Sequence, residues 1–409
     1  MNNSMKIAHF VHRYRPTIGG SEQYMIDLSE RLAKRGHYVT VYTSRAISSD
    51  TWTNALPPRE TINGVHVKRF GSISRTKIVW DILQYGYTNY PKRKDFMTQL
   101  AIFLGNGPIS LSWYLSQYLD REKYDIVHTT ALPYSHIYYA FNFARRKGIP
   151  FVITPFIHTE QKNIFEVKYF FDILRNADAV IAATDYERKY LESHGIDGNK
   201  LYTVGLGVDF MELGEYGKTP FKPSIGLKED EGYILFLGRK EYYKGIDVLI
   251  KAFNLIKNDY PRLHLLLIGP RTPYSEKLMA DVTDKERIIE MDAVTDAEKN
   301  DALRLADIVV LPSTYESFGI VFIEAWANHK PVIGARSGAI VDVIRDKENG
   351  LLFTPGDDRD LAEKLKMLLN DKALRDFMGD NGYRMVKEKY TKDAIADKLE
   401  ELYLSLGRK

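Results

Sequence analysis

The sequence predicts an α/β protein with two doubly wound, parallel-sheet domains that face a cleft. Three observations support this fold class. The 409 residues exceed one ordinary compact domain and suit two domains of roughly 200 residues each. Short apolar runs alternate with amphipathic stretches along most of the chain, as in parallel strands joined by helices. This rhythm stops near the middle of the chain and then restarts.

The first half contains five runs that we expect to be strands. The first run, residues 6–12, precedes a loop with Gly19 and Gly20 and then a helical apolar spacing over residues 21–34. The other four runs are YVTVYT, DIVHTT, PFVITPF and AVIAAT, which begin at Tyr38, Asp125, Pro150 and Ala179. Residues 1–207 are therefore predicted to form an N-terminal Rossmann-like domain.

An irregular stretch, residues 205–227, marks the expected domain boundary. After it, five more strands are predicted as YILFLG, LHLLLIG, RIIEM, DIVVLP and PVIGA, which begin at Tyr233, Leu263, Arg287, Asp307 and Pro331. A last helical segment, residues 393–406, follows a break at Tyr390 and Thr391. We expect a C-terminal Rossmann-like domain over residues 208–390 and a terminal helix over residues 391–409.

Composition excludes several classes of protein. With 44% hydrophobic and 27% charged residues, the chain is globular rather than collagen-like, low in complexity or disordered. No apolar run approaches the ~20 residues that span a bilayer, and the N-terminus lacks a signal-peptide core. We therefore expect a cytoplasmic protein, peripheral at the cytoplasmic face of the membrane. The absence of cysteine excludes disulfides and thiolate chemistry.

Basic residues are concentrated in the first half of the chain. Up to residue 207 there are 26 Lys and Arg against 18 Asp and Glu, a net charge of +8, whereas the whole chain carries +3. The excess is greatest in residues 59–94, which also contain Trp80 and several tyrosines. Cations mixed with aromatics are typical of an anionic membrane surface, and ordinary solvated faces are the alternative. We predict membrane contact through residues 59–94, with Arg75 among the contacting cations.

Two loops between a predicted strand and a predicted helix could bind an anion, because free N–H groups and the helix dipole point outward there. In the first loop, Gly19 and Gly20 let the backbone approach a ligand without a Cβ, although a tight turn explains them almost as well. In the second, LGRKEYYKG, Arg239 leaves a strand and Lys244 precedes a helix opened by Gly245. Two such cations could clamp a diphosphate, and two exposed surface cations are the alternative.

A third loop, STYESFGIVFIEAWA, follows the DIVVLP strand. Glu316 lies just after that strand, and Ser317 is expected to cap the next helix. The residues that would offer unpaired N–H groups are Phe318, Gly319, Ile320 and Val321. Glu324 lies about one turn into the helix. Ionised carboxylates accept hydrogen bonds from vicinal hydroxyls, so the loop predicts a sugar beside an anion.

These motifs together resemble one family. GGSEQ near the N-terminus, GRKEYYKG at the start of the second domain, and ESFGIVFIEAWA with the later ENGLLF resemble the retaining glycosyltransferases of family 4, which have the GT-B fold. The resemblance runs over essentially the whole chain and in the right order. It implies a hexosyltransferase with a UDP- or GDP-linked sugar donor, bound mainly to the second domain. The acceptor, a glycan or a lipid-linked molecule, would bind the N-terminal domain, and the terminal helix would cross back onto that domain.

The resemblance also implies roles for individual residues. Arg239 and Lys244 would hold the diphosphate, and Glu316 would bond the hydroxyls of the donor sugar. His158 in PFIHTE matches a histidine that meets the donor sugar, so it completes the predicted catalytic set. The remaining expected donor contacts are Gly19 and Gly20, the backbone of Phe318 and Gly319, the amides of Ile320 and Val321, Glu324 at the ribose and Val294 near the base.

Other interpretations are weaker. Asp358-Arg359-Asp360 matches the Asp-x-Asp triplet of metal-dependent transferases, but its place before LAEKLKMLL favours the acidic first turn of a helix. We therefore expect no metal and no other cofactor, and retention by same-face substitution. P-loop, dinucleotide and nucleic-acid motifs are absent from the sequence. A sugar-nucleotide 2-epimerase and a non-catalytic nucleotide-sugar binder stay open as alternatives on the same scaffold.

Overall fold

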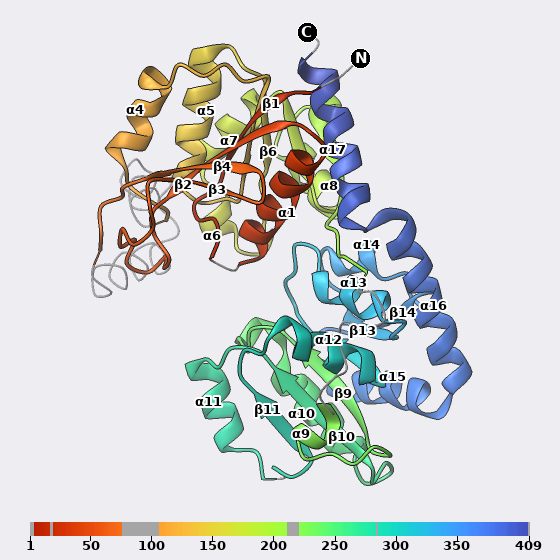
Figure 1. Cartoon of the computed structure of the whole chain (residues 1–409). Helices are drawn as coiled ribbons and strands as arrows, with labels where there is room; N and C mark the ends of the chain where they lie inside the picture. The colour runs from red at the N-terminus through yellow and green to blue at the C-terminus, as the bar shows by residue number, and fades with distance from the viewer. Residues whose placement is uncertain (1–3, 17–18, 76–105, 211–220, 284, 408–409) are drawn as a thin grey trace. The chain divides into compact units, whose positions relative to one another are not determined.

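The computed structural model describes residues 4–16, 19–75, 106–210, 221–283 and 285–407. The chain divides into two compact units (Figure 1). Unit 1 comprises Met1–Gly205 and Ile395–Lys409, and unit 2 comprises Leu206–Ala394. Each unit contains one largely parallel sheet with helices packed on it, so the predicted class of two parallel-sheet α/β domains is confirmed.

The sheet of unit 1 has eight strands in the order β3-β4-β2-β1-β5-β6-β7-β8. All neighbouring strands are parallel except β3 and β4. The strands are β1 (Lys6–Phe10), β2 (Tyr38–Ser44), β3 (Arg59–Ile62), β4 (Val65–Phe70), β5 (Ile126–Thr130), β6 (Phe151–Thr154), β7 (Ala179–Ala182) and β8 (Leu201–Thr203). The strand order reverses between β1 and β5, which places the loops after these two strands side by side.

Helices of unit 1 cover this sheet. They are α1 (Gly20–Lys34), α4 (Leu111–Leu119), α5 (His136–Lys147), α6 (Lys162–Phe165), α7 (Lys168–Asn176), α8 (Asp185–Ser193), the 3₁₀ turn η1 (Gly198–Lys200) and α17 (Lys392–Gly407). In α1, Met25, Leu28 and Leu32 are buried at helical spacing, as the sequence predicts. Aromatic stacking fills the core, where the ring centroids of Phe10 and Tyr42 lie 4.5 Å apart.

Helix α17 is joined to unit 1 through a buried polar network. The hydroxyl of Tyr403 hydrogen-bonds Nδ1 of His128 and lies 3.3 Å from Nε2 of His9. His9 Nδ1 contacts Ser29 Oγ at 2.7 Å, and His128 Nε2 contacts Thr154 Oγ1 at 2.8 Å. Because all three rings are fully buried, these bonds satisfy polar groups that would otherwise destabilise the domain.

Unit 2 has a six-stranded parallel sheet in the order β11-β10-β9-β12-β13-β14. Its strands are β9 (Gly232–Leu237), β10 (Leu263–Ile268), β11 (Ile288–Met291), β12 (Ile308–Leu311), β13 (Val332–Ala335) and β14 (Gly350–Phe353). Its helices are α9 (Phe221–Ser224), the 3₁₀ turn η2 (Tyr242–Lys244), α10 (Ile246–Ile256), α11 (Pro273–Ala280), α12 (Asp296–Leu305), α13 (Ile320–Ala327), α14 (Ile340–Val343), α15 (Asp358–Asn370) and α16 (Lys372–Lys389). Strand order reverses between β9 and β12.

The Asp-x-Asp triplet is part of a helix start, as predicted. Asp358 and Asp360 lie in the first turn of α15, and the side chain of Asp357 accepts hydrogen bonds from the amides of Arg359 and Asp360. Asp360 also accepts from the amide of Thr354 at 2.7 Å. These carboxylates therefore stabilise the helix N-terminus. In the part of the chain that the structure describes, no helix is both long enough and apolar enough to cross a membrane.

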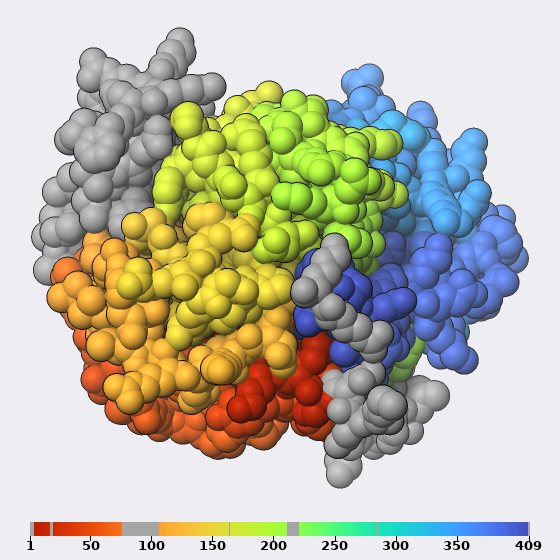
Figure 2. Space-filling view, turned by 90° about the horizontal axis from the view of Figure 1, so that it is seen from above, coloured from red at the N-terminus to blue at the C-terminus, as the bar shows by residue number. Residues whose placement is uncertain are grey.

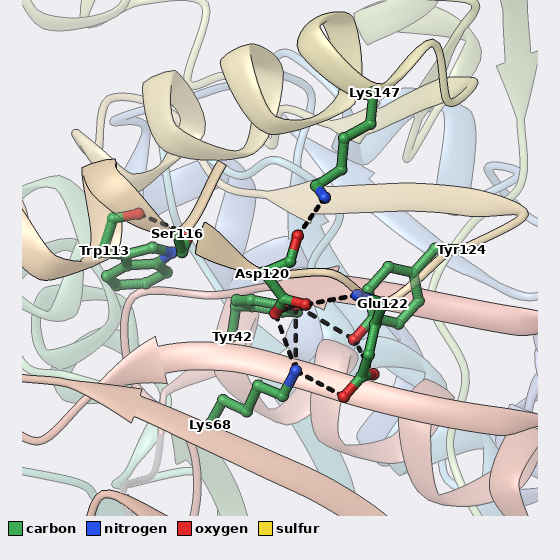
Figure 3. A network of polar contacts seen from close by, with 8 residues as sticks. All are labelled: Tyr42, Lys68, Trp113, Ser116, Asp120, Glu122, Tyr124 and Lys147. Atoms are coloured by element: carbon green, nitrogen blue, oxygen red, sulfur yellow. Dashed lines mark hydrogen bonds and ion pairs between the residues drawn. The ribbon is translucent and has the colours of Figure 1, made fainter. Parts of the chain in front are cut away.

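The basic segment over residues 59–94 differs from the sequence prediction where it is described. It begins with an unpredicted hairpin, in which β3 and β4 are joined by Asn63 and Gly64 with φ angles of 48° and 81°. Lys68 of β4 forms ion pairs of 2.8 Å with Asp120 and 2.9 Å with Glu122 (Figure 3). The charge of Lys68 is therefore neutralised within the domain.

Two further cations of this segment also point inward. The guanidinium of Arg69 is buried and pairs with Glu60 across the hairpin. Arg75 is 9% exposed, and it donates a hydrogen bond of 2.7 Å to the carbonyl of Gly107. Arg75 is thus not the surface cation that the membrane prediction requires. Arg59, the other described cation of the segment, is exposed, and residues 76–94 lie outside the described residues.

Candidate functional site

The loops after β9 and β12 hold the cluster of charged residues that the sequence singles out in unit 2. Lys244 ends the turn η2, and Glu316 follows β12. Lys244 Nζ lies 2.5 Å from Glu316 Oε1, and the two side chains are only 15% and 10% exposed. Ligands of open α/β sheets bind outside the carboxyl ends of the strands where strand order reverses. The Lys244–Glu316 pair lies at such a point of the unit 2 sheet.

Backbone contacts fix the two loops against each other. The amide of Thr314 donates to the carbonyl of Tyr243 at 2.9 Å. Gly245 has a φ of +68°, and a Cβ there would lie 2.5 Å from the carbonyl oxygen of Pro312. A glycine is therefore required where the loop after β9 presses on the end of β12. This contact holds Lys244 within reach of Glu316.

Helix α13 begins beside Glu316. Its N-cap is Gly319, with a φ of 81° and no side-chain cap, so the predicted capping by Ser317 is wrong. A Cβ at Gly319 would lie 2.7 Å from the ring of Phe322, which explains the glycine. Ile320 and Val321 form the first turn of the helix, where N–H groups have no intrahelical acceptor. The helix thus presents N–H donors next to the Lys244–Glu316 pair.

Arg239 lies at the carboxyl end of β9, as predicted. Its ion-pair partner is a residue of the same loop. Its Nε lies 3.1 Å from Glu241 Oε1, and its side chain is 68% exposed. Arg239 therefore stands at the edge of the site, whereas Lys244 is largely enclosed. An exposed guanidinium on a long side chain can reorient with little loss of free energy when an anion binds.

Lys240 is a residue of this loop that the sequence analysis missed. Its side chain is fully buried, pairs with Glu290 at 2.8 Å and donates to the carbonyl of Met291 at 2.7 Å. Burial lowers the pKa of Lys240, and the pair with Glu290 opposes that shift. Lys240 ties the loop after β9 to the end of β11 and so sets the path between Arg239 and Lys244. A sequence with adjacent cations offers no signal for which of them is buried.

Glu324 and Val294 belong to neighbouring elements of unit 2. Glu324, in α13, forms an ion pair of 2.9 Å with Lys299 of α12. Val294 is half-buried in the loop between β11 and α12. The capping box of Thr295 and Glu298 starts α12 directly after it. Among the described residues, no three His, Asp or Glu side chains gather as ligands of a metal ion.

The other predicted residues belong to unit 1. Gly19 is the N-cap of α1 and Gly20 its first residue. A Cβ at Gly19 would lie 2.5 Å from Oε2 of Glu22, which is buried and pairs with His12 at 2.9 Å and Arg13 at 2.5 Å. Burial opposes ionisation of Glu22, but these two neighbours hold its pKa well below its usual range. Glu22 thus connects the end of β1 to the start of α1.

His158 lies in the loop after β6, and a buried carboxylate orders that loop. The preceding Phe156 has a φ of 51°, which is uncommon for a residue with a side chain. Glu187 of α8 accepts hydrogen bonds from the amides of Ile157 and Ala183, each at 2.7 Å. Burial raises the pKa of Glu187 to about 7, against the opposing effect of these donors. Glu187, which the sequence analysis missed, therefore positions the backbone beside His158.

Replacing Glu187 by alanine should loosen this loop. Two buried amides would lose their acceptor, and each unsatisfied group costs about 1–3 kcal/mol. We expect hydrogen exchange at the amides of Ile157 and Ala183 to accelerate by about tenfold or more. Mass-spectrometric exchange on peptides covering residues 152–158 and 180–186 measures this.

The matched control is Glu192→Ala on the same helix. Glu192 is exposed and pairs only loosely with Arg188, at 3.4 Å, so its removal should leave exchange in both peptides unchanged. Equal acceleration in the two variants, or none in Glu187→Ala, would show that the Glu187 carboxylate does not order the loop.

Comparisons with known proteins agree with this architecture. The family model described as "Glycosyl transferase 4-like domain" matches residues 19–207, and "Glycosyl transferases group 1" matches residues 217–385. An uncharacterised glycosyltransferase of Methanocaldococcus jannaschii is 25% identical over 98% of this chain and 98% of its own. A D-inositol 3-phosphate glycosyltransferase of Kineococcus radiotolerans is 28% identical over 90% of this chain and 86% of its own.

Solved structures share the fold. Sucrose-phosphate synthase from Thermosynechococcus elongatus superposes with a TM-score of 0.74 at 23% identity, covering 98% of this chain and 99% of that one. The Anabaena protein HepE in complex with UDP and glucose also gives 0.74, at 18% identity, with 98% and 100% coverage. These neighbours have the GT-B fold, so the predicted fold is confirmed. The two family models together span most of the chain, which therefore belongs to the family 4 glycosyltransferases.

Proposed function

We propose that this glycosyltransferase moves a hexose from a nucleotide-diphosphate sugar to a hydroxyl of a glycan or lipid-linked acceptor, with retention of anomeric configuration. The observation that carries the proposal is the Lys244–Glu316 pair beside the first turn of α13. An ammonium and helix N-terminal amides suit a diphosphate. A carboxylate suits the hydroxyls of the attached sugar.

Donor binding would exchange partners within this cluster. Without a donor, Lys244 and Glu316 satisfy each other at 2.5 Å. A bound diphosphate would take over Lys244 and the amides of Ile320 and Val321, and Glu316 would turn to the sugar hydroxyls. Arg239 would leave Glu241 and add a second cation. Glu324 and Val294 would bind the ribose and base, and Gly19, Gly20 and His158 would contact the donor sugar from unit 1.

We propose a same-face substitution without a metal ion. The bond between the anomeric carbon and the diphosphate oxygen breaks as the acceptor oxygen bonds to the same face of that carbon. The acceptor proton passes to the departing diphosphate. Lys244, Arg239 and the α13 amides would stabilise the growing negative charge. Double displacement needs a carboxylate nucleophile at the anomeric carbon, whereas Glu316 is assigned here to the hydroxyls.

Related proteins support a nucleotide-sugar donor. HepE was solved with UDP and glucose, and also with UDP-glucose. The name of the Kineococcus relative specifies an inositol phosphate as acceptor, which is a hydroxyl compound. These names describe the relatives. The experiment below identifies the donor of this chain.

Thermal-shift screening against UDP-, GDP- and ADP-linked sugars should identify a donor, because a ligand that binds the native state raises its melting temperature. With this donor and an acceptor, nucleotide should be released rapidly, EDTA should have no effect, and NMR of the product should show a retained anomeric configuration. A panel without any stabilising nucleotide sugar would contradict the proposal.

The same assay separates the alternatives. A 2-epimerase would convert the donor sugar in the absence of an acceptor. A non-catalytic binder would be stabilised by the donor but would release no nucleotide with any acceptor. Trapping of a glycosyl adduct on Glu316 would replace same-face substitution by double displacement.

A further inference from the structure

Helix α4 carries an apolar face on the outside of unit 1. Leu111, Leu115, Tyr118 and Leu119 follow one another at helical spacing and form what we call the α4 face. Leu111 is 71% exposed, Leu119 72% and Tyr118 47%. Three large apolar side chains on one short helix face are unusual for a surface that meets only water.

The buried side of the same helix is partly polar. Ser116 and Gln117 are buried together with Trp113. Ser116 Oγ donates to the carbonyl of Trp113 at 2.6 Å, and Gln117 Nε2 donates to the carbonyl of Tyr114 at 3.0 Å. These polar groups are satisfied by the helix's own backbone. Helix α4 thus buries two polar residues beside Trp113 and leaves leucines exposed, unlike an ordinary surface helix.

The apolar surface continues from α4 to the chain after β4. Ile73 is 62% exposed. An open hollow of about 440 Å³ is lined by Ile73, Ile109, Leu111 and Leu115, with Gly71 and three serines, Ser72, Ser110 and Ser112, around them. Exposed leucines and isoleucine therefore form one continuous patch rather than scattered contacts with solvent.

Cations outnumber carboxylates beside the α4 face. Asp120 and Glu122 follow the helix directly, but both carboxylates pair with Lys68 (Figure 3). Arg121 and Lys123, which alternate with them along the chain, are exposed. One lysine balances only one of these two carboxylates, and the Glu122 side chain is 40% exposed, so the two exposed cations stand beside one uncompensated negative charge.

Helix α5, which packs beside α4, adds cations at the same edge (Figure 1). Arg145 and Arg146 are exposed in its last turn. The guanidinium of Arg146 lies 3.7 Å from the ring centroid of Tyr118, so a cation and an aromatic ring of the α4 face are stacked. Arg145 pairs weakly with Asp178, at 3.5 Å. Figure 2 shows atoms of the orange-to-yellow stretch of unit 1, which includes α4 and α5, at the surface.

We propose that the α4 face, with its rim of Arg121, Lys123, Arg145 and Arg146, docks on an anionic lipid membrane. Leucines can enter the acyl boundary of one leaflet, while tyrosine and arginine side chains lie at the level of the headgroups. The rim cations match the charge of anionic lipid. The proposal moves the membrane contact from Lys68, Arg69 and Arg75 to a surface that the sequence analysis did not identify. It is independent of the catalytic proposal, because vesicle binding requires no turnover.

Vesicle co-sedimentation of the full chain tests this. The wild type should bind vesicles in which about one third of the lipid is phosphatidylglycerol, and should bind pure phosphatidylcholine much more weakly. The double variant Leu111→Glu, Leu119→Glu should bind the anionic vesicles about tenfold more weakly or worse. Arg146→Glu should also weaken binding, and added salt should reduce wild-type binding.

The matched control is Leu255→Glu on α10 of unit 2, a leucine that is 52% exposed. It should bind vesicles like the wild type. Both leucine variants change exposed positions, and circular dichroism verifies that they fold. Failure of the wild type to bind, or equal losses in the control and the double variant, would overturn the proposal. Concentration-dependent dimerisation that the double variant abolishes, without vesicle binding, would instead assign the α4 face to a second copy of the chain.

Discussion

Lys244→Ala should lower kcat by about 10²-fold or more, which corresponds to about 2.7 kcal/mol of lost transition-state stabilisation. The substitution removes a fixed positive charge from the place where the leaving diphosphate would develop negative charge. It also leaves the Glu316 carboxylate without an ion-pair partner, since that side chain is only 10% exposed and lies 2.5 Å from Lys244 in the wild type. Steady-state kinetics with the donor found by thermal shift measures the effect.

Two further variants separate these causes. Lys251→Ala removes an exposed lysine of α10 that lies 3.5 Å from Asp247, and it should leave kcat unchanged. The double variant Lys244→Ala, Glu316→Gln removes the stranded charge, and it should stay as inactive as the single variant. Recovery of activity in the double variant would mean that the stranded carboxylate, rather than the missing cation, inhibits the enzyme. In that case Lys244 would have no role at the diphosphate.

Acidification should destabilise unit 1 strongly. Burial lowers the pKa of His9 to about 3 and the pKa values of His128 and His136 well below their usual range. Unfolded histidines bind protons below about pH 6.5, whereas these three stay neutral when folded, so stability falls as pH drops through that value. At pH 5.5 the three histidines together lower the free energy of unfolding by about 4 kcal/mol.

Glu187 changes the pH dependence of stability in the opposite direction to the histidines. Its pKa of about 7 in the folded chain exceeds the unfolded value, so its contribution to stability is present at low pH and is lost as pH rises through 7. This offsets about 2 kcal/mol of the loss at pH 5.5. Urea titrations between pH 8 and 5.5 should therefore show a net loss of about 2 kcal/mol.

A substitution at one of the three histidines checks the assignment. His128→Gln cannot titrate, and it should flatten the pH dependence even though it lowers stability at pH 8. His329→Asn is the control, because His329 is 52% exposed and pairs with Asp380 at the surface of unit 2. A urea midpoint that stays constant or rises toward pH 5.5 would show that the buried histidines do not govern acid stability.

Strand and helix positions were largely predictable because period and composition are local properties. Apolar runs such as YILFLG and LHLLLIG correspond to β9 and β10, and the helical spacing after Gly20 corresponds to α1. The hairpin of β3 and β4 was missed although its signal was present. Asn63-Gly64 between alternating residues is typical of a two-residue hairpin turn. The many cations of that region drew the interpretation toward a membrane surface instead.

The candidate site was only partly predictable. The order of the motifs placed Lys244 and Glu316 at strand ends, but their contact depends on β9 and β12 being neighbours in the sheet. Lys240 and Glu187 gave no signal, because burial of a charged residue is set by elements far away in the sequence. Glu187, for example, contacts the amide of Ile157, which lies on the loop after another strand.

By itself, the sequence determined the α/β class, the division into two sheet domains and the family, since each depends on patterns within short segments and on their order. Tertiary structure alone decided which charges are available at the surface. Lys68, 52 residues from Asp120, is neutralised there, whereas the leucines of α4 are left exposed. A charge count along the chain treats every cation as solvated, but a folded chain brings distant carboxylates to within 3 Å of some cations and leaves others in water.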